Sequence, residues 1–253
     1  MDPYYPNSDD KGFSGTLRQV VILFVGSLGL NIYATVLVVL RARVYGTRLY
    51  RPMLWNIFLS IVPVLILAVV MAVSVALVVV APPLSVAALV VGGVAWLLML
   101  PNASYLITEL NQSHRKADDP VPLWYDIILV ISLAMSGVIN TVVNVFLAHT
   151  IFALQFFGDQ AGAFTRWPSL VAVGGVLVAI AFGMYLGRYI RVNSWDIRHP
   201  GALLRRVGEH FLTRTTRGAA IGFTATYAIF LALIYTVVAG PIVENLLNLE
   251  AQR

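Results

Sequence analysis

Long apolar stretches without any charge alternate with short polar segments along the chain. The longest uncharged stretch lies between Arg51 and Glu109 and has 57 residues. A helix needs about 20 apolar residues to cross a bilayer, so this stretch must fold back on itself, with Ala81-Pro82-Pro83 as the turn. The whole pattern predicts an all-α fold, a polytopic transmembrane helix bundle of six spans, at about residues 19–40, 53–80, 85–107, 123–150, 169–190 and 218–239.

The chain reads as one membrane domain with two polar ends. We expect residues 1–18 to form an outer N-terminal tail, residues 19–239 the six-helix domain and residues 240–253 an outer C-terminal tail. No small-residue cleavage site follows the first apolar stretch, so we expect the first span to be retained rather than removed as a signal peptide.

Three spans carry features that disturb a regular helix. Pro63 is expected to kink the second span without breaking it, because membrane helices tolerate proline. Pro101 is expected to interrupt the third span shortly before its end. The fourth apolar block is longer than one upright span, so residues 123–157 form either a tilted helix that continues along the outer surface or a helix broken near Asn140–Asn144.

Composition agrees with a membrane protein and excludes several other classes. Hydrophobic residues make up 59% of the chain and charged residues 11%, against about 25% charged in soluble domains. A water-soluble enzyme, a disordered chain and a nucleic-acid-binding module are excluded on this basis, and we expect no nucleic-acid partner. The chain has no cysteine, which excludes disulfides and zinc–thiolate sites, and we expect no metal and no cofactor.

The distribution of basic residues predicts the orientation in the membrane. Thirteen of the 17 lysines and arginines fall in the first, third and fifth loops. The positive-inside rule places these three loops in the cytoplasm, so both termini are expected outside.

Polar residues at two span ends suggest a site on the cytoplasmic side. Asn102, Tyr105 and Glu109 share one helical face at the end of the third span. Trp124 and Asp126 open the fourth span. The alternative is a pair of ordinary helix ends, with aromatic side chains at the interface, Glu109 in water and Asp126 near a helix N-terminus.

The end of the fifth span is the most informative segment. Arg188 and Arg191 lie three residues apart at the cytoplasmic rim and are followed by Asn193, Trp195 and Asp196. Arginine is costly in lipid, so we expect these side chains either to pair with carboxylates inside the bundle or to reach out to the interface. We therefore hypothesise a cytoplasmic-side polar cluster in which arginines pair with acids, formed by Asn102, Tyr105, Glu109, Trp124, Asp126, Arg188, Arg191, Asn193, Trp195 and Asp196.

Small residues repeat every four positions along the fifth span. Gly175, Ala179, Gly183 and Gly187 form a stripe on one helical face. Such a stripe lets the backbone of another helix approach closely, so it predicts a helix-packing surface.

Other polar residues carry weaker predictions. Asn31, Asn140 and Asn144 can form hydrogen bonds between helices. His149 is interpreted as an interface residue rather than a ligand. The segment with Arg205, Arg206, Arg214, Arg217, Phe211 and Leu212 is either a surface helix attracted to anionic lipid or a set of arginines that only sets topology.

Several of these segments together resemble one known family. They are Leu54-Trp55-Asn56 with Pro63, Leu100-Pro101-Asn102-Ala103-Ser104-Tyr105 with Thr108, Pro122-Leu123-Trp124-Tyr125-Asp126, and the block from Tyr185 to Asp196 with Pro200. The set resembles the bacterial membrane protein family called domain of unknown function 1361, over about residues 50–240. Ser104 stands where proline is expected, and Glu109 where aspartate is usual. The resemblance implies a multi-pass protein of the bacterial cytoplasmic (inner) membrane and brings no activity.

Three functions remain open on the sequence alone. The first is a structural or accessory subunit, or an assembly factor, of a membrane complex, with membrane lipids and other membrane subunits as partners. The second is a transporter or flippase for a small anionic or lipid-phosphate solute. The third is an enzyme that acts on a lipid-linked substrate at the cytoplasmic face. The absence of a recognisable catalytic motif favours the first.

Overall fold

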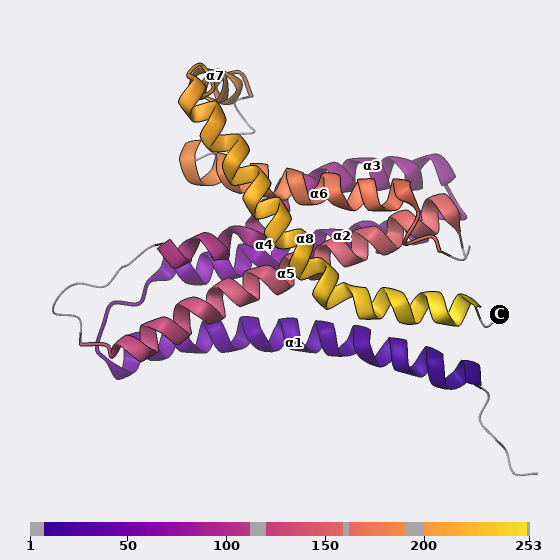
Figure 1. Cartoon of the computed structure of the whole chain (residues 1–253), viewed down its shortest axis with the longest axis horizontal. Coiled ribbons are helices and arrows are strands. Elements are labelled where there is room, and N and C mark those ends of the chain that lie inside the picture. The colour runs from indigo at the N-terminus through magenta and orange to yellow at the C-terminus, as the bar shows by residue number, and fades with distance from the viewer. Residues whose placement is uncertain (1–7, 112–119, 159–161, 191–199, 252–253) are drawn as a thin grey trace, which may run out of the picture.

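The chain is a bundle of long helices, seen here in a computed structural model that describes residues 8–111, 120–158, 162–190 and 200–251 (Figure 1). Over these residues the structure is helical and contains no strand. Six helical segments are long and apolar enough to cross a membrane, which confirms the predicted all-α class and the six spans. The elements in chain order are α1 (Ser8–Val44), α2 (Arg51–Val78), α3 (Pro82–Met99), α4 (Pro101–Tyr105), the short 3-10 helix η1 (Leu106–Asn111), α5 (Leu123–Phe157), α6 (Trp167–Tyr185), the π-helical turn η2 (Leu186–Ile190), α7 (Pro200–His210) and α8 (Arg214–Ala251).

The helices extend beyond the predicted spans. The first begins at Ser8, inside the expected N-terminal tail, and the last continues to Ala251, through most of the expected C-terminal tail. These two ends meet, because the Asn245 side chain donates a hydrogen bond of 2.9 Å to the Gln19 side chain. Of the two alternatives for residues 123–157, the break near Asn140–Asn144 is wrong and the continuous helix is confirmed, because α5 is one uninterrupted helix.

The two prolines act differently. Pro63 lies inside α2, and the helix continues past it. Pro101 separates α3 from α4, because it has no N–H to donate and begins a new helix at its own position. The N–H of Leu100 still donates to the Trp96 carbonyl, and the N–H of Ala103 donates to the Leu100 carbonyl, so the third span continues across Pro101.

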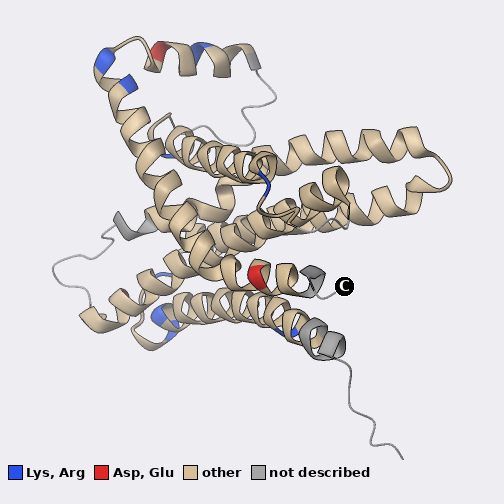
Figure 2. Cartoon of the chain, turned by 45° about the vertical axis from the view of Figure 1, so that its right-hand side comes forward, with Lys and Arg blue, Asp and Glu red and all other residues tan. Residues whose placement is uncertain are grey.

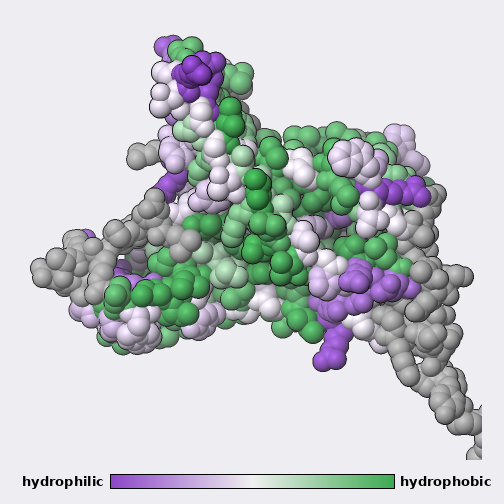
Figure 3. Space-filling view, viewed as in Figure 1, coloured by the Kyte–Doolittle hydropathy of each residue, from purple (hydrophilic) through white to green (hydrophobic). Residues whose placement is uncertain are grey.

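The fifth helix, α5, occupies the middle of the bundle. In Figure 1 it runs between α1 on one side and α3 and α6 on the other. The first part of α8 crosses the other helices at a steep angle, and its last part runs alongside α1. In its most apolar stretch 61% of the residues are buried, against 17–33% in the other five spans. Charged residues avoid most of the helix surface in Figure 2, and Figure 3 shows the apolar side chains that cover it, as lipid requires.

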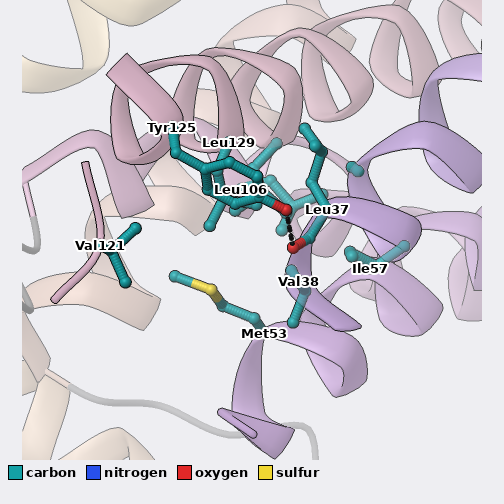
Figure 4. Packing of buried hydrophobic residues seen from close by; sticks show 10 residues of the cluster. Leu37, Val38, Met53, Ile57, Leu106, Val121, Tyr125 and Leu129 are labelled. Carbon is teal, nitrogen blue, oxygen red and sulfur yellow. Dashed lines mark hydrogen bonds between the residues drawn. The ribbon is translucent and has the colours of Figure 1, made fainter. Parts of the chain in front are cut away.

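One end of the bundle has a compact apolar core. Figure 4 shows Leu37 of α1 and Ile57 of α2 packed around Leu106 and Tyr125. The Tyr125 hydroxyl donates a hydrogen bond of 2.8 Å to the Leu37 carbonyl. Nearby, a Cβ on Gly137 would lie 2.9 Å from the Leu106 Cβ, so only glycine lets α5 approach this closely.

Candidate functional site

A set of neutral polar side chains lies inside the bundle where α1, α2 and α5 meet. We call Ser27, Asn31, Ser60 and Asn140 the Asn140 cluster; all four are buried. The Asn140 Oδ1 accepts hydrogen bonds of 2.8 Å from both Ser27 and Asn31. The Asn140 Nδ2 donates to the Asn31 Oδ1 at 3.0 Å and to the Ser60 Oγ at 2.8 Å. One amide therefore ties three helices together.

The Asn140 cluster satisfies its own hydrogen-bonding capacity. Asn31 also donates to the Ser27 carbonyl, and Ser60 donates to the Ile57 carbonyl. Hydrocarbon offers no alternative partner, so buried amides and hydroxyls in a membrane bond to each other or to backbone carbonyls. Each interhelical bond of this kind contributes about 0.6 kcal/mol on average and up to about 1.7. The structure confirms that Asn31 and Asn140 bond between helices.

A half-open pocket of about 290 Å³ borders the cluster. Its polar floor is formed by Ser27, Asn31, Ser60 and Asn140, and its apolar wall includes Phe24 and Leu28, among other residues. The polar floor is already hydrogen-bonded. The pocket can therefore accept an apolar group without leaving an amide unpaired.

Two further bonds extend the polar row along α5. The Trp96 Nε1 of α3 donates to the Asn144 Oδ1 at 3.0 Å, and the Asn144 Nδ2 donates to the Asn140 carbonyl at 2.8 Å. The hydroxyls of Ser104 and Thr141 lie 2.5 Å apart and join α4 to α5. Asn144 thus also bonds between helices, as the sequence predicted.

His149 lies toward the C-terminal end of α5 and is buried. Its Nε2 lies 3.1 Å from the Phe164 carbonyl oxygen, and its Nδ1 lies 2.8 Å from the Tyr235 hydroxyl of α8. A carbonyl can only accept, so Nε2 carries a proton, and in the neutral imidazole Nδ1 accepts from Tyr235. A second half-open pocket, of about 310 Å³, lies beside His149 and Trp96.

An ion pair joins α1 to α5 near the opposite end. The Arg41 Nε donates to the Asp126 Oδ1 at 2.8 Å, and the two side chains are only 20% and 19% exposed. Arg41 also contacts the Thr47 hydroxyl at 3.3 Å. The sequence analysis missed this partner, because Arg41 was counted only among the basic residues of the first loop that set the orientation in the membrane. The available signal was that Arg41 ends the first span on the side where Asp126 begins the fourth.

The predicted cytoplasmic-side cluster is described only in part. The Asn102 amide donates to the Met99 carbonyl at 3.0 Å, one turn earlier in the chain. Tyr105 and Arg188 are half-buried, and Trp124 is exposed. The Glu109 side chain and Arg191, Asn193, Trp195 and Asp196 lie outside the described residues. The pairing of Arg188 or Arg191 with Glu109, Asp126 or Asp196 therefore stays a prediction.

The small-residue stripe faces two different surroundings. A Cβ on Gly183 would clash with the Pro101 ring of α4, and one on Gly187 would lie 3.5 Å from the Tyr105 ring. At Gly175 a Cβ would meet nothing within 4 Å. The close approach of another helix therefore occurs at Gly183 and Gly187, where the Pro101 ring needs the space that a glycine leaves. Ala179 lies between these two glycines and Gly175.

An aromatic group holds the segment that follows α6. The Tyr185 hydroxyl lies 2.8 Å from the His210 Nε2 and donates to the Thr216 carbonyl at 3.3 Å. The Tyr185 ring stacks on Tyr189, with centroids 4.6 Å apart, and meets Phe223 edge-on at 5.7 Å. These contacts fix α7 and the start of α8 to the end of α6.

The described residues offer no site for a metal ion. Over these residues, no group of three or more histidines, aspartates or glutamates could hold one. The polar side chains around α5 are amides, hydroxyls, one imidazole and one ion pair. Their chemistry is that of hydrogen bonding between helices.

Comparison with known proteins identifies a family but no function. The family model described as protein of unknown function (DUF1361) matches residues 55–234, which is well over half of the chain. No curated protein and no solved structure matches the chain. The match agrees with the resemblance carried by the proline, asparagine and arginine segments of the sequence.

Proposed function

The chain belongs to this family of unknown function (DUF1361), and from that premise we propose that it is a structural or accessory subunit, or an assembly factor, of a larger complex in the bacterial cytoplasmic membrane. One observation carries the proposal. The buried polar side chains along α5 have their hydrogen-bond partners on neighbouring helices of the same chain: Asn140 on α1 and α2, Asn144 on α3, and His149 on α8.

The exposure of the outer helices also supports a subunit role. Five of the six spans bury no more than 33% of their most apolar stretch. Their outer faces are apolar and must be covered by lipid or by other membrane proteins. A chain with one well-buried helix and five peripheral ones offers long faces for further spans.

Native extraction tests the proposal. We would solubilise the membrane with a styrene–maleic acid copolymer, purify the full chain and measure the mass and protein content of the particles. The expected result is a second membrane protein in fixed stoichiometry, which also captures this chain when the tag is moved to the partner. A particle that holds only this 27.7 kDa chain and lipid would contradict a subunit role.

Transport of a small solute is the second candidate, and one observation favours it. A pocket of about 290 Å³ borders the Asn140 cluster and is lined mostly by apolar side chains, so it has room for an apolar group such as part of a lipid acyl chain. If the chain purifies without a protein partner, a transport function is favoured over a subunit role. Transport that is lost in Leu28→Trp, which narrows the pocket and removes none of the cluster's hydrogen bonds, and kept in Val91→Trp on the exposed side of α3 would then assign the pocket to the solute.

The proposed orientation places both termini outside and loops one, three and five in the cytoplasm. The support is that loop five alone holds seven of the 17 basic residues when Arg188 is counted with it. The chain has no cysteine, so a single cysteine reports on one position. On intact cells an impermeant maleimide should label Val80→Cys, in the turn after α2, and should reach Leu49→Cys only after permeabilisation. The reverse labelling would overturn the orientation.

A further inference from the structure

The short helix α7 differs from the spans in its direction. Figure 1 looks almost along α7, whereas α1, α5 and α6 run across the picture, so α7 lies roughly perpendicular to them. Figures 1 and 2 both show α7 and the first turns of α8 projecting sideways beyond the other helices. Because α7 connects the ends of two spans, we expect it at the membrane boundary, beside the bundle.

This segment carries a concentrated positive charge. Arg205 and Arg206 lie on α7, and Arg214 and Arg217 lie in the first turn of α8; all four are exposed. Over residues 200–217 the only acid is Glu209. It pairs with Arg205 at 2.8 Å, with side chains 81% and 58% exposed, so water screens the pair strongly. The segment therefore keeps an excess of three positive charges.

Large apolar side chains are exposed among these arginines. Leu204 is 71% exposed and Leu212 is 75% exposed. A helix with arginines beside exposed leucines is typical of one that lies in the membrane interface, with leucine in the acyl region and guanidinium groups at the phosphates.

The opposite side of α7 is anchored to the protein. His210 bonds the Tyr185 hydroxyl of α6, and the Thr216 hydroxyl donates to the His210 carbonyl at 2.5 Å. Phe211 stacks on Phe182 with ring centroids 6.2 Å apart. These contacts hold α7 in place, so binding on its outer side costs little further ordering.

We propose that α7 and the first turn of α8 form an in-plane docking surface for the phosphate headgroups of anionic lipids. The charge excess complements an anionic leaflet, and each arginine near such a surface contributes about a fivefold gain in binding. Leu204 and Leu212 favour a lipid bilayer as the occupant, because they can enter its acyl region. This surface is independent of the proposed subunit role, since it needs no protein partner.

Fluorescence quenching by lipid tests the docking surface on the full chain. Leu212→Cys is labelled with a nitrobenzoxadiazole probe in vesicles of phosphatidylcholine with one quarter phosphatidylglycerol. Either the phosphatidylcholine or the phosphatidylglycerol is brominated, so that quenching reports which headgroup lies near the probe. Val80→Cys, exposed in the turn after α2, is the matched control.

The expected result is a several-fold enrichment of phosphatidylglycerol near position 212 and none near position 80. In 0.5 M NaCl, or in Arg205→Gln/Arg206→Gln, the enrichment should fall to the control value. Both arginines are exposed, so this variant should fold, and the salt measurement needs no variant. Equal enrichment of both lipids at position 212, or a probe that neither lipid quenches, would overturn the proposal; the second result would show that position 212 lies away from the bilayer.

Discussion

Two spans of nearly equal apolarity have opposite places in this protein. The most apolar stretch of Leu123–Phe157 has a mean hydropathy of 2.0, and that of Pro82–Thr108 has 2.2. In the first, 61% of the residues are buried; in the second, 17% are. Hydrophobicity therefore does not decide which helix becomes central, because lipid is as apolar as a leucine side chain.

Polar and small residues account for the difference. Along α5, the side chains of Asp126, Asn140, Asn144 and His149 each bond to another part of the chain, and Gly137 lets α4 and η1 approach. In a membrane such groups are stabilised by hydrogen bonds and close contacts with other helices, which lipid cannot provide. Other helices therefore pack around α5. The following predictions test whether α5 and α3 differ for this reason.

The largest effect is expected at the centre of the Asn140 cluster. Asn140→Leu keeps the volume but removes the bonds to Ser27, Asn31 and Ser60, and it leaves these groups in an apolar site. We expect a loss of about 2 kcal/mol in the free energy of unfolding, measured by SDS titration in mixed micelles with circular dichroism. The matched control is Asn102→Leu, whose amide bonds only to Met99 in its own segment. Equal losses in the two variants would contradict the special role of the cluster.

The ion pair between α1 and α5 should have the next largest effect. Asp126→Asn removes the carboxylate that the Arg41 Nε contacts. About one fifth of each side chain is exposed, so water reduces the cost of losing this pair. We expect a loss of about 1–1.5 kcal/mol in the same titration. Arg41→Gln/Asp126→Asn should lose less than the two single changes added together. Simple additivity would show that the two residues do not interact.

A smaller effect is expected where α3 meets α5. Trp96→Phe removes one hydrogen bond to Asn144 and keeps an aromatic ring. We expect a loss of about 0.6–1 kcal/mol, and no further loss from this change when Asn144→Leu is already present. A loss of the same size in the Asn144→Leu background would exclude the Trp96–Asn144 bond as its source.

The smallest effect is expected on the lipid-facing side of α3. Val91 is 70% exposed, so Val91→Ala changes only contact with lipid. We expect a change within about 0.5 kcal/mol in the same titration. The comparison is sharpened by Val142→Ala on α5, which is 2% exposed and should cost about 1 kcal/mol or more. Equal effects at the two valines would remove the contrast between the helices.

The sequence predicted the spans because charge is so costly in lipid. Uncharged stretches identify membrane segments whatever their neighbours are, and all six were found. Pro101 also predicted its interruption, because a proline removes one backbone donor wherever it stands. The continuity of α5 was harder to predict, because Asn140 and Asn144 suggest a break when their partners on other helices are unknown.

Contacts between distant segments could not be predicted in the same way. Helical spacing shows which residues share a face of one helix, but it does not show which helices become neighbours. The contact between the Asp126 carboxylate and Arg41, 85 positions away in the chain, was therefore not predicted, and only the arginines of the fifth span were considered as its partners. Ser27 and Ser60 carried no signal of their own, because a serine can bond to its own helix and needs no partner elsewhere.

A double-mutant cycle between Asn31 and Asn140 tests the central claim, that polar side chains on α5 hold the bundle together. Asn31→Leu, Asn140→Leu and the double variant are compared by SDS titration of the full chain. The account predicts that each single change destabilises the fold by about 1–2 kcal/mol and that the double variant is no less stable than the worse single variant, because neither amide is then left unpaired. Single variants as stable as the original chain would contradict the account and leave the cluster free for a role other than packing.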